Sequence, residues 1–293
     1  MEEKMILETY EQKRARIQEF NLTSDLFAGK VFEDLAACQE LCRILTQDSG
    51  LLLKDVKTQY VVRNLETHSV QLDVLAEEIR GSLISIELQM YSENEPLRRT
   101  RYYMSCIDVS ILEKGKDYYE LPSMTLVYIT KTDIIGGGKG SYQIERRVRG
   151  NGQLIKANVG NGLSERYYNL KYPTTDEKIN ELLAYMEKSD PFYRTESFPR
   201  IVERVNYFKV QKGGLDIMCE IADRIRQEGK MEGKIEGKIE GKIEDILELL
   251  EELGKIPAKI ARHIRQERDL MVLARWHKCA AAAASIAEFE AKM

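Results

Sequence analysis

The sequence lacks any apolar run long enough to span a bilayer or to form a signal peptide, and it is charged from Glu2 onward. Its five cysteines are odd in number and show no CxxC spacing, and its three histidines lack partners at metal-ligand spacing. These shortages exclude a disulfide framework and a zinc site. They predict a cytoplasmic protein that makes no contact with a membrane.

A strong excess of one charge is also lacking, because 44 basic and 48 acidic side chains leave a formal net charge of -4. Any contact with DNA therefore has to come from local basic patches. Arg98, Arg99 and Arg101 form one patch, with no acid between them. The other patch, within residues 139–171, has two acids and seven basic residues, which are Lys139, Arg146, Arg147, Arg149, Lys156, Arg166 and Lys171. An ordinary solvated face is the alternative for each patch.

What the sequence does contain is enough apolar material, 43% of 293 residues, for one sizeable domain and an appendage. Alternating or β-branched stretches predict strands at residues 55–64, 69–76, 82–90 and 121–130. Apolar residues at three- and four-residue steps predict helices at 25–46, at 97–112 and from Thr175 onward, with Thr174 or Thr175 as N-cap. This order of elements indicates an α/β (α+β) fold.

The C-terminal third is predicted to be helical. Residues 229–244 repeat GK(M/I)E four times, which favours a weak linker helix, because every turn contains a glycine. Residues 245–293 are expected to form a small helical module with Trp276 as a packing anchor. Together with a charged leader at 1–21, these boundaries leave residues 22–228 as the main domain.

Polar residues gather on one face of two neighbouring predicted strands. Asp73 lies on the polar face of residues 69–76, and Ser85, Glu87 and Gln89 share the polar face of residues 82–90. The short turn between these strands would bring Asp73 nearly opposite Glu87. We therefore expect the two carboxylates to lie close together.

Two neighbouring carboxylates are hard oxygen ligands that suit Mg²⁺ or Mn²⁺. Such a cation lowers the pKa of a bound water and stabilises charge on a phosphate, so the spacing D-x13-E-x-Q is consistent with phosphodiester hydrolysis. The alternative is an amphipathic hairpin, which places polar residues on its solvent face without any function.

The chain resembles the PD-(D/E)XK nuclease-family transposases, which are similar to the recombination-promoting nucleases, over residues 22–228. Four segments carry the resemblance in order and spacing: VKTQYVVRNLETHSVQLDVLAEE, ISIELQM, RRTRYYMSCIDVSILEKGKDYYELP and TLVYITKTDIIGGGKGSYQIER. The resemblance implies a restriction-endonuclease-like core, with a mixed central sheet flanked by helices and followed by a helical C-terminal region. It also implies a metal-dependent DNA endonuclease associated with recombination or mobile elements.

On this resemblance Asp73 is the first acid of the motif and Glu87 the second, and both bind the metal. Gln89 stands where many PD-(D/E)XK enzymes have lysine. Glutamine can hydrogen-bond a water or a phosphate oxygen, but it has no positive charge and cannot act as a base.

Many PD-(D/E)XK folds add an acid from the first helix, and here the candidates are Glu33, Asp34 and Glu40. A DNA-backbone role falls to the arginines of the first patch, since most protein–DNA hydrogen bonds go to phosphate and sugar. A homodimer through the C-terminal helices would provide two active centres. The alternative to an enzyme is a decayed nuclease fold that binds DNA or a protein partner without hydrolysis.

Overall fold

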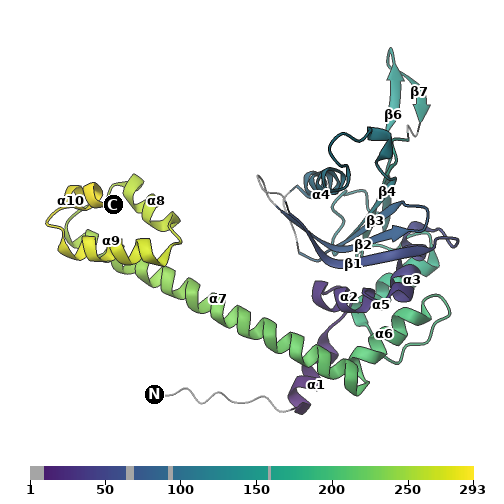
Figure 1. Cartoon of the computed structure of the whole chain (residues 1–293), viewed down its shortest axis with the longest axis horizontal. Helices are drawn as coiled ribbons and strands as arrows, with labels where there is room; N and C mark the ends of the chain where they lie inside the picture. Colours follow the sequence, from purple (N-terminus) through teal and green to yellow (C-terminus); the bar gives the residue numbers. More distant parts are fainter. Residues whose placement is uncertain (1–9, 64–68, 92–94, 158–159) are drawn as a thin grey trace. The chain divides into compact units, whose positions relative to one another are not determined.

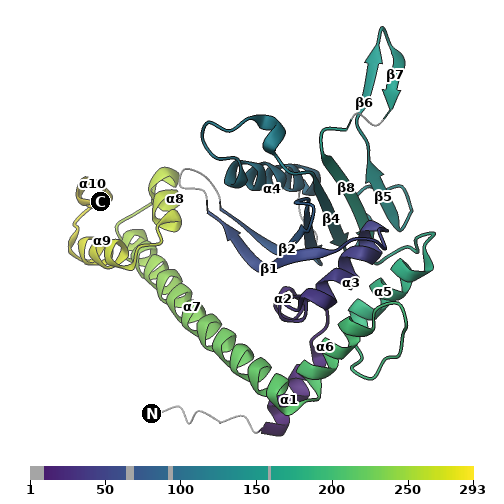
Figure 2. The same ribbon diagram turned by 45° about the vertical axis from the view of Figure 1, so that its right-hand side comes forward.

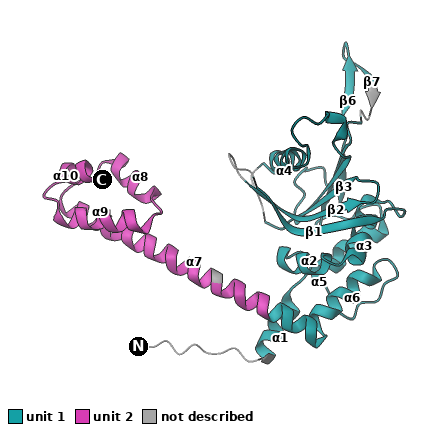
Figure 3. Ribbon diagram, viewed as in Figure 1, with its two compact units in different colours: residues 1–219 teal, residues 220–293 magenta. Residues whose placement is uncertain are grey.

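A computed structural model of the chain describes residues 10–63, 69–91, 95–157 and 160–293 (Figure 1). The chain forms two compact units, residues 1–219 and residues 220–293 (Figure 3). The first unit contains a sheet with helices, and the second is helical.

The first unit is built on a six-stranded sheet. In spatial order its strands are β1 (Leu53–Val62), β2 (Val70–Glu78), β3 (Leu83–Gln89), β4 (Met124–Thr130), β8 (Leu163–Asn169) and β5 (Ser141–Ile144). The pairs β3–β4 and β4–β8 are parallel, and the other neighbours are antiparallel. The predicted α/β class with a mixed central sheet is confirmed.

Helices cover both faces of this sheet. Helix α4 (Pro96–Ile111) lies on one face, and helices α2 (Asp25–Phe32) and α3 (Leu35–Thr46) lie on the other (Figures 1 and 2). Strand β3 is therefore central and is buried from Leu83 to Leu88. The alternative of a hairpin with a solvent-exposed polar face does not hold for β3, because the face that carries its polar residues is buried as well.

Three local expectations need correction. The helix expected at 25–46 is two helices, because the Asp34 side chain accepts a hydrogen bond from the backbone N–H of Ala37 and begins α3 as its N-cap. The leader is not only a charged tail. Its residues 10–19 form helix α1 (Tyr10–Glu19), in which Ile17 is fully buried. Residues 1–9 of the leader lie outside the described residues.

The third correction concerns helix α5 (Glu177–Lys188). Its N-cap is Asp176, not Thr174 or Thr175, because the Asp176 carboxylate accepts from the backbone N–H groups of Lys178 and Ile179. Helices α6 (Pro199–Lys209) and α7 (Lys212–Glu252) follow.

Two short strands stand apart from the main sheet. Strands β6 (Arg147–Gly150) and β7 (Gln153–Ala157) pair only with each other, as a two-stranded antiparallel hairpin. The hairpin extends away from the sheet beyond β5 and β8 (Figures 1 and 2).

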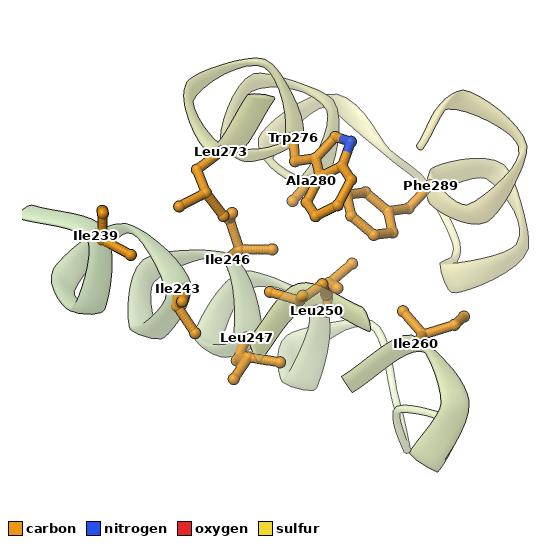
Figure 4. Packing of buried hydrophobic residues seen from close by; sticks show 11 residues of the cluster. Ile239, Ile243, Ile246, Leu247, Leu250, Ile260, Leu273, Trp276, Ala280 and Phe289 are labelled. Atoms are coloured by element: carbon orange, nitrogen blue, oxygen red, sulfur yellow. The ribbon is translucent and has the colours of Figure 1, made fainter. Parts of the chain in front are cut away.

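The second unit is built on the end of α7. Helices α8 (Ala258–Gln266), α9 (Leu270–Ala282) and α10 (Ile286–Lys292) enclose a core in which Trp276 is 2% exposed and Phe289 is fully buried (Figure 4). Ile239 and Ile243 of the GK(M/I)E repeat join this core. The repeat is part of one continuous helix, and the predicted helical C-terminal region is confirmed. Among the described residues, no helix has the length and apolar character needed to cross a membrane.

The loop between β4 and β5 depends on a close backbone approach at Gly140. A Cβ atom on Gly140 would lie 2.4 Å from the carbonyl oxygen of Tyr172 and 2.4 Å from the carbonyl carbon of Pro173. We expect Gly140→Ala to lower the free energy of unfolding by about 1–3 kcal/mol, because backbone atoms cannot move aside cheaply. Chemical denaturation measures this difference.

Gly160→Ala is the matched control, since a Cβ atom there would meet nothing within 4 Å. It should change the free energy of unfolding by less than about 0.5 kcal/mol. Equal denaturation midpoints for the two variants would contradict the predicted role of Gly140.

Candidate active site

Asp73 and Glu87 lie where the pairing of β2 with β3 ends. The last pair of this ladder is Val74 with Ile86, and Asp73 and Glu87 are the next residues on their strands. Strand β3 remains paired with β4 beyond this point, as far as Gln89. The two acids therefore occupy the position at which β2 stops pairing with the centre of the sheet.

The carboxylates take over hydrogen bonds that the ladder would otherwise make. The backbone N–H of Leu88 donates to Asp73 Oδ2 at 2.8 Å. In the opposite direction, the backbone N–H of Asp73 donates to the Glu87 carboxylate, which favours its ionised form. Each strand thus satisfies a backbone donor of the other through a side chain, which holds the two acids side by side.

Burial makes a charge on Glu87 costly. Its side chain is 4% exposed, and Ser85 Oγ, fully buried, donates to Glu87 Oε1 at 2.9 Å. Burial is the main reason why the pKa of Glu87 is raised well above its usual range, and the negative charge of Asp73 raises it further. The charge of Asp73 thus acts directly on its neighbour Glu87.

Asp73 is perturbed in the same sense. Burial raises the pKa of Asp73 to about 6, against the opposing effect of the Leu88 N–H, and the charge of Asp25 adds to the rise. Gln59 Nε2 donates to Asp73 Oδ1 at 3.3 Å and to the Asp25 carbonyl oxygen at 3.2 Å. Gln59 thereby links the start of α2 to the carboxylate on β2.

Asp25 and Gln59 are residues that the sequence analysis missed. Asp25 is the first residue of α2, a position where an acid is common for helix stability alone. Gln59 lies within β1 with a left-handed backbone, φ 50°. No motif marks either residue, so only the three-dimensional arrangement identifies them.

The three acids expected from the first helix are engaged elsewhere. Glu33 is exposed and pairs with Lys30 at 2.6 Å, and Asp34 caps α3. Glu40 accepts from the backbone N–H groups of Arg200 and Ile201, at the start of α6. The structure does not bring any of the three to Asp73 and Glu87.

The three arginines of α4 differ in their surroundings. The Arg99 guanidinium lies over the ring of Tyr103, 5.0 Å from its centroid, and its charge acts to lower the pKa values of Asp73 and Glu87. Arg98 is exposed and contacts Glu95 at 3.3 Å, and Arg101 is exposed. Of these three, Arg99 is therefore the one whose charge acts on the acidic pair.

Gln89 lies at the end of β3, beside Thr130 of β4. Its side chain is half-buried, and Nε2 donates to the carbonyl oxygen of Tyr91 at 3.3 Å. Strand alternation places Gln89 on the same face as Glu87.

The two carboxylates fit a hard divalent cation that takes only a few of its ligands from the protein. Within the described ranges, no cluster of three or more His, Cys, Asp or Glu side chains is placed to hold a metal ion. Mg²⁺ is nevertheless commonly bound by one or two carboxylates together with waters and substrate phosphates. Half-buried Asp73 and buried Glu87, where the charge of the first disfavours a charge on the second, fit this kind of coordination.

Comparison with known proteins gives one match. Residues 52–148, about a third of the chain, match the family model described as PD-(D/E)XK nuclease family transposase. The matched range contains Asp73, Glu87, Gln89 and the three arginines of α4, so the resemblance is confirmed for this part. No curated protein and no solved structure matches the chain.

The burial of Asp73 generates a prediction about stability without metal. Its pKa of about 6 in the folded chain, against 3.8 ordinarily, means that the unfolded chain loses its proton first as pH rises. Charging Asp73 therefore costs the folded state up to about 3 kcal/mol, a cost that develops between about pH 4 and pH 6. Asp73→Asn should remove this cost and still accept a hydrogen bond from Leu88.

The measurement is chemical denaturation in a chelator across this pH range. We expect Asp73→Asn to exceed the wild type by about 1–3 kcal/mol at about pH 7.5 and to match it near pH 4. Asp55→Asn, at an exposed position on β1, is the control and should show no such gain. A variant that is less stable than the wild type at the higher pH would contradict the burial argument.

Proposed function

Given the match of residues 52–148 to a nuclease-family model, we propose that the chain is a metal-dependent DNA endonuclease associated with recombination or mobile elements. The observation that carries this proposal is the pair of neighbouring carboxylates at the end of the β2–β3 ladder, half-buried Asp73 and buried Glu87, with the charge of Asp73 acting on Glu87. A purely structural role would not favour two unneutralised acids at a buried position.

Asp73 and Glu87 are the proposed ligands of Mg²⁺ or Mn²⁺. When bound, such a cation lowers the pKa of a coordinated water and stabilises charge that develops on the phosphate. The chain itself provides orientation, because the Leu88 N–H and Gln59 fix Asp73 while Ser85 fixes Glu87. Preorganised ligands of this kind need little rearrangement when a cation binds.

Where many PD-(D/E)XK sites have one lysine that both donates a hydrogen bond and carries a positive charge, this chain has Gln89 for the hydrogen bond and Arg99 for the charge. Gln89 can donate to a phosphate oxygen or a water, but it cannot accept the proton of the attacking water as a base. Arg99 provides the positive charge that Gln89 lacks. Arg98 and Arg101, both exposed, are assigned to the DNA backbone.

Asp25 takes the place that we expected for Glu33, Asp34 or Glu40. Its carboxylate raises the pKa of Asp73 through its charge, and Gln59 bridges its backbone to Asp73. We assign Asp25 to the outer part of the same site. A homodimer through the C-terminal helices, which would supply one site for each strand of a duplex, stays a prediction.

Cleavage of supercoiled plasmid at low salt tests the proposed activity. The wild type should nick plasmid with Mg²⁺ or Mn²⁺ and not with a chelator. Asp73→Ala and Glu87→Ala should each slow nicking by at least ~100-fold, because each removes one of two groups that place the cation. Asp55→Ala, which removes an exposed acid from β1, should nick like the wild type.

The results separate the two candidate functions. Equal nicking by the wild type and Asp73→Ala would place the activity outside this site or in a contaminant. Binding of DNA without nicking by the wild type under any metal condition would instead support a decayed nuclease fold that acts as a binding protein.

The contrast between Arg99 and Arg98 gives a further test. Arg99→Gln should reduce nicking by ~10- to 100-fold, since a hydrogen bond to a charged group contributes about 1.5–3 kcal/mol. Arg98→Gln, which removes the same charge from an exposed side chain, should reduce it only slightly. Single-turnover kinetics at saturating DNA measures the two rates. Equal losses would mean that Arg99 acts only on the DNA backbone.

A further inference from the structure

The hairpin β6–β7 carries a dense group of positive charges. Arg146, Arg147 and Arg149 are exposed, and Glu145 is the one acid between residues 141 and 157. An Arg147 guanidinium nitrogen lies 3.5 Å from Glu145, and Arg149 donates to the Gly152 carbonyl oxygen at 3.1 Å. These contacts are local and solvent-exposed, so the three guanidinium groups can reach a partner.

The rest of the predicted second basic patch lies elsewhere. Arg166 donates to Gln47 Oε1 at 3.0 Å, and Lys171 lies over the ring of Tyr172. The side chain of Lys156 lies outside the described part of the chain. Of the seven basic residues of this patch, Arg146, Arg147 and Arg149 therefore lie together at the hairpin.

Apolar side chains are exposed on the same hairpin. Val148 is 43% exposed, Leu154 49% and Ile155 69%. The register shifts after Val148, which leaves Ile155 as the extra residue of a bulge and increases the twist of the ribbon. An isolated two-stranded ribbon is only marginally stable in water. A partner surface that covers these side chains would therefore stabilise the hairpin.

We propose that hairpin β6–β7 enters a groove of duplex DNA, with Arg146, Arg147 and Arg149 on phosphates. The inference rests on the proposed function, since it names how that enzyme holds its substrate. A two-stranded ribbon fits the major groove of B-DNA. The positive charge of the exposed ribbon is complementary to the negative charge of the phosphate backbone. Val148, Leu154 and Ile155 provide apolar contacts to base edges.

The topology places this contact away from the carboxylates. The site lies towards the Gln89–Thr130 end of the parallel strands, whereas β5 runs to Ile144 beside Glu165, and β8 starts at Leu163. The hairpin therefore leaves the sheet at the opposite end. Along the strands, Glu87 is level with Tyr167, four residues or about 13 Å from Leu163. The hairpin accordingly contacts a part of the duplex outside the cut itself.

Binding of labelled duplex DNA of about 30 base pairs, between about 50 and 200 mM salt, tests the proposal. Fluorescence anisotropy in a chelator keeps binding separate from cleavage. The variant replaces Arg146, Arg147 and Arg149 by Gln in the full chain. Its affinity at the lowest salt should fall at least ~10-fold, and the slope of log K against log salt should lose about 2 to 3 units, since each phosphate contact contributes about 0.9.

The matched control replaces Lys230, Lys234 and Lys238, three exposed lysines of the repeat, by Gln and so removes the same charge. It should retain the affinity of the wild type within about twofold and its slope within about one unit. Equal losses for both variants would overturn the hairpin assignment. So would a loss for the arginine variant on duplex RNA without a loss on duplex DNA.

Circular dichroism and the thermal midpoint check that the arginine variant folds. If it does not, Arg149→Gln alone should lower the slope by about one unit, and no change would overturn the proposal. Plasmid nicking distinguishes the two hypotheses. If the wild type nicks plasmid and the arginine variant binds DNA with unchanged affinity, only this inference is refuted. If the arginine variant binds DNA more weakly and the wild type does not nick plasmid, the endonuclease is refuted and this inference stands.

Discussion

The end of the β2–β3 ladder is the constraint on which the site depends. Beyond the pair Val74–Ile86, backbone donors of the two strands bond to carboxylates of the opposite strand. Because β3 continues along β4, Glu87 stays fixed in the buried centre of the sheet, while Asp73 lies on β2 where this strand stops pairing with β3 and pairs only with β1. Rigid strands thus hold two carboxyl groups side by side, with α2 on one face of the sheet and α4 on the other.

This arrangement lowers the stability of the folded chain. A protein under selection for stability alone would replace buried, mutually repelling acids by apolar side chains of similar volume. The surrounding groups reduce the cost only in part: Ser85 and Gln59 donate hydrogen bonds, and Arg99 adds a positive charge. The remaining electrostatic cost is what a divalent cation would remove on binding, so the free protein is destabilised where the loaded protein would be stabilised.

Sequence reasoning reached the parts of the site that follow from strand periodicity. Alternation placed Asp73 and Glu87 on the polar faces of two neighbouring strands, and the structure brings them side by side. It could not find Asp25 or Gln59, because the approach of α2 to β1 is a tertiary contact without a local pattern. It also misjudged the N-cap of α5, since three neighbouring residues offer capping oxygens and only packing selects Asp176. Charge density along the chain likewise did not reveal that the second patch divides between the hairpin and the body.

The repeat within α7 has a consequence for how the chain opens. Its four glycines have open space where a Cβ atom would lie, so packing within the chain does not require their small size, yet each weakens the helix by about 1 kcal/mol relative to alanine. Equal charges recur at four-residue steps and provide no compensating ion pairs. Transient unwinding should therefore concentrate in residues 229–238, ahead of the turns that Ile239 and Ile243 anchor. This stretch of helix should unfold locally at a lower free energy than either compact unit.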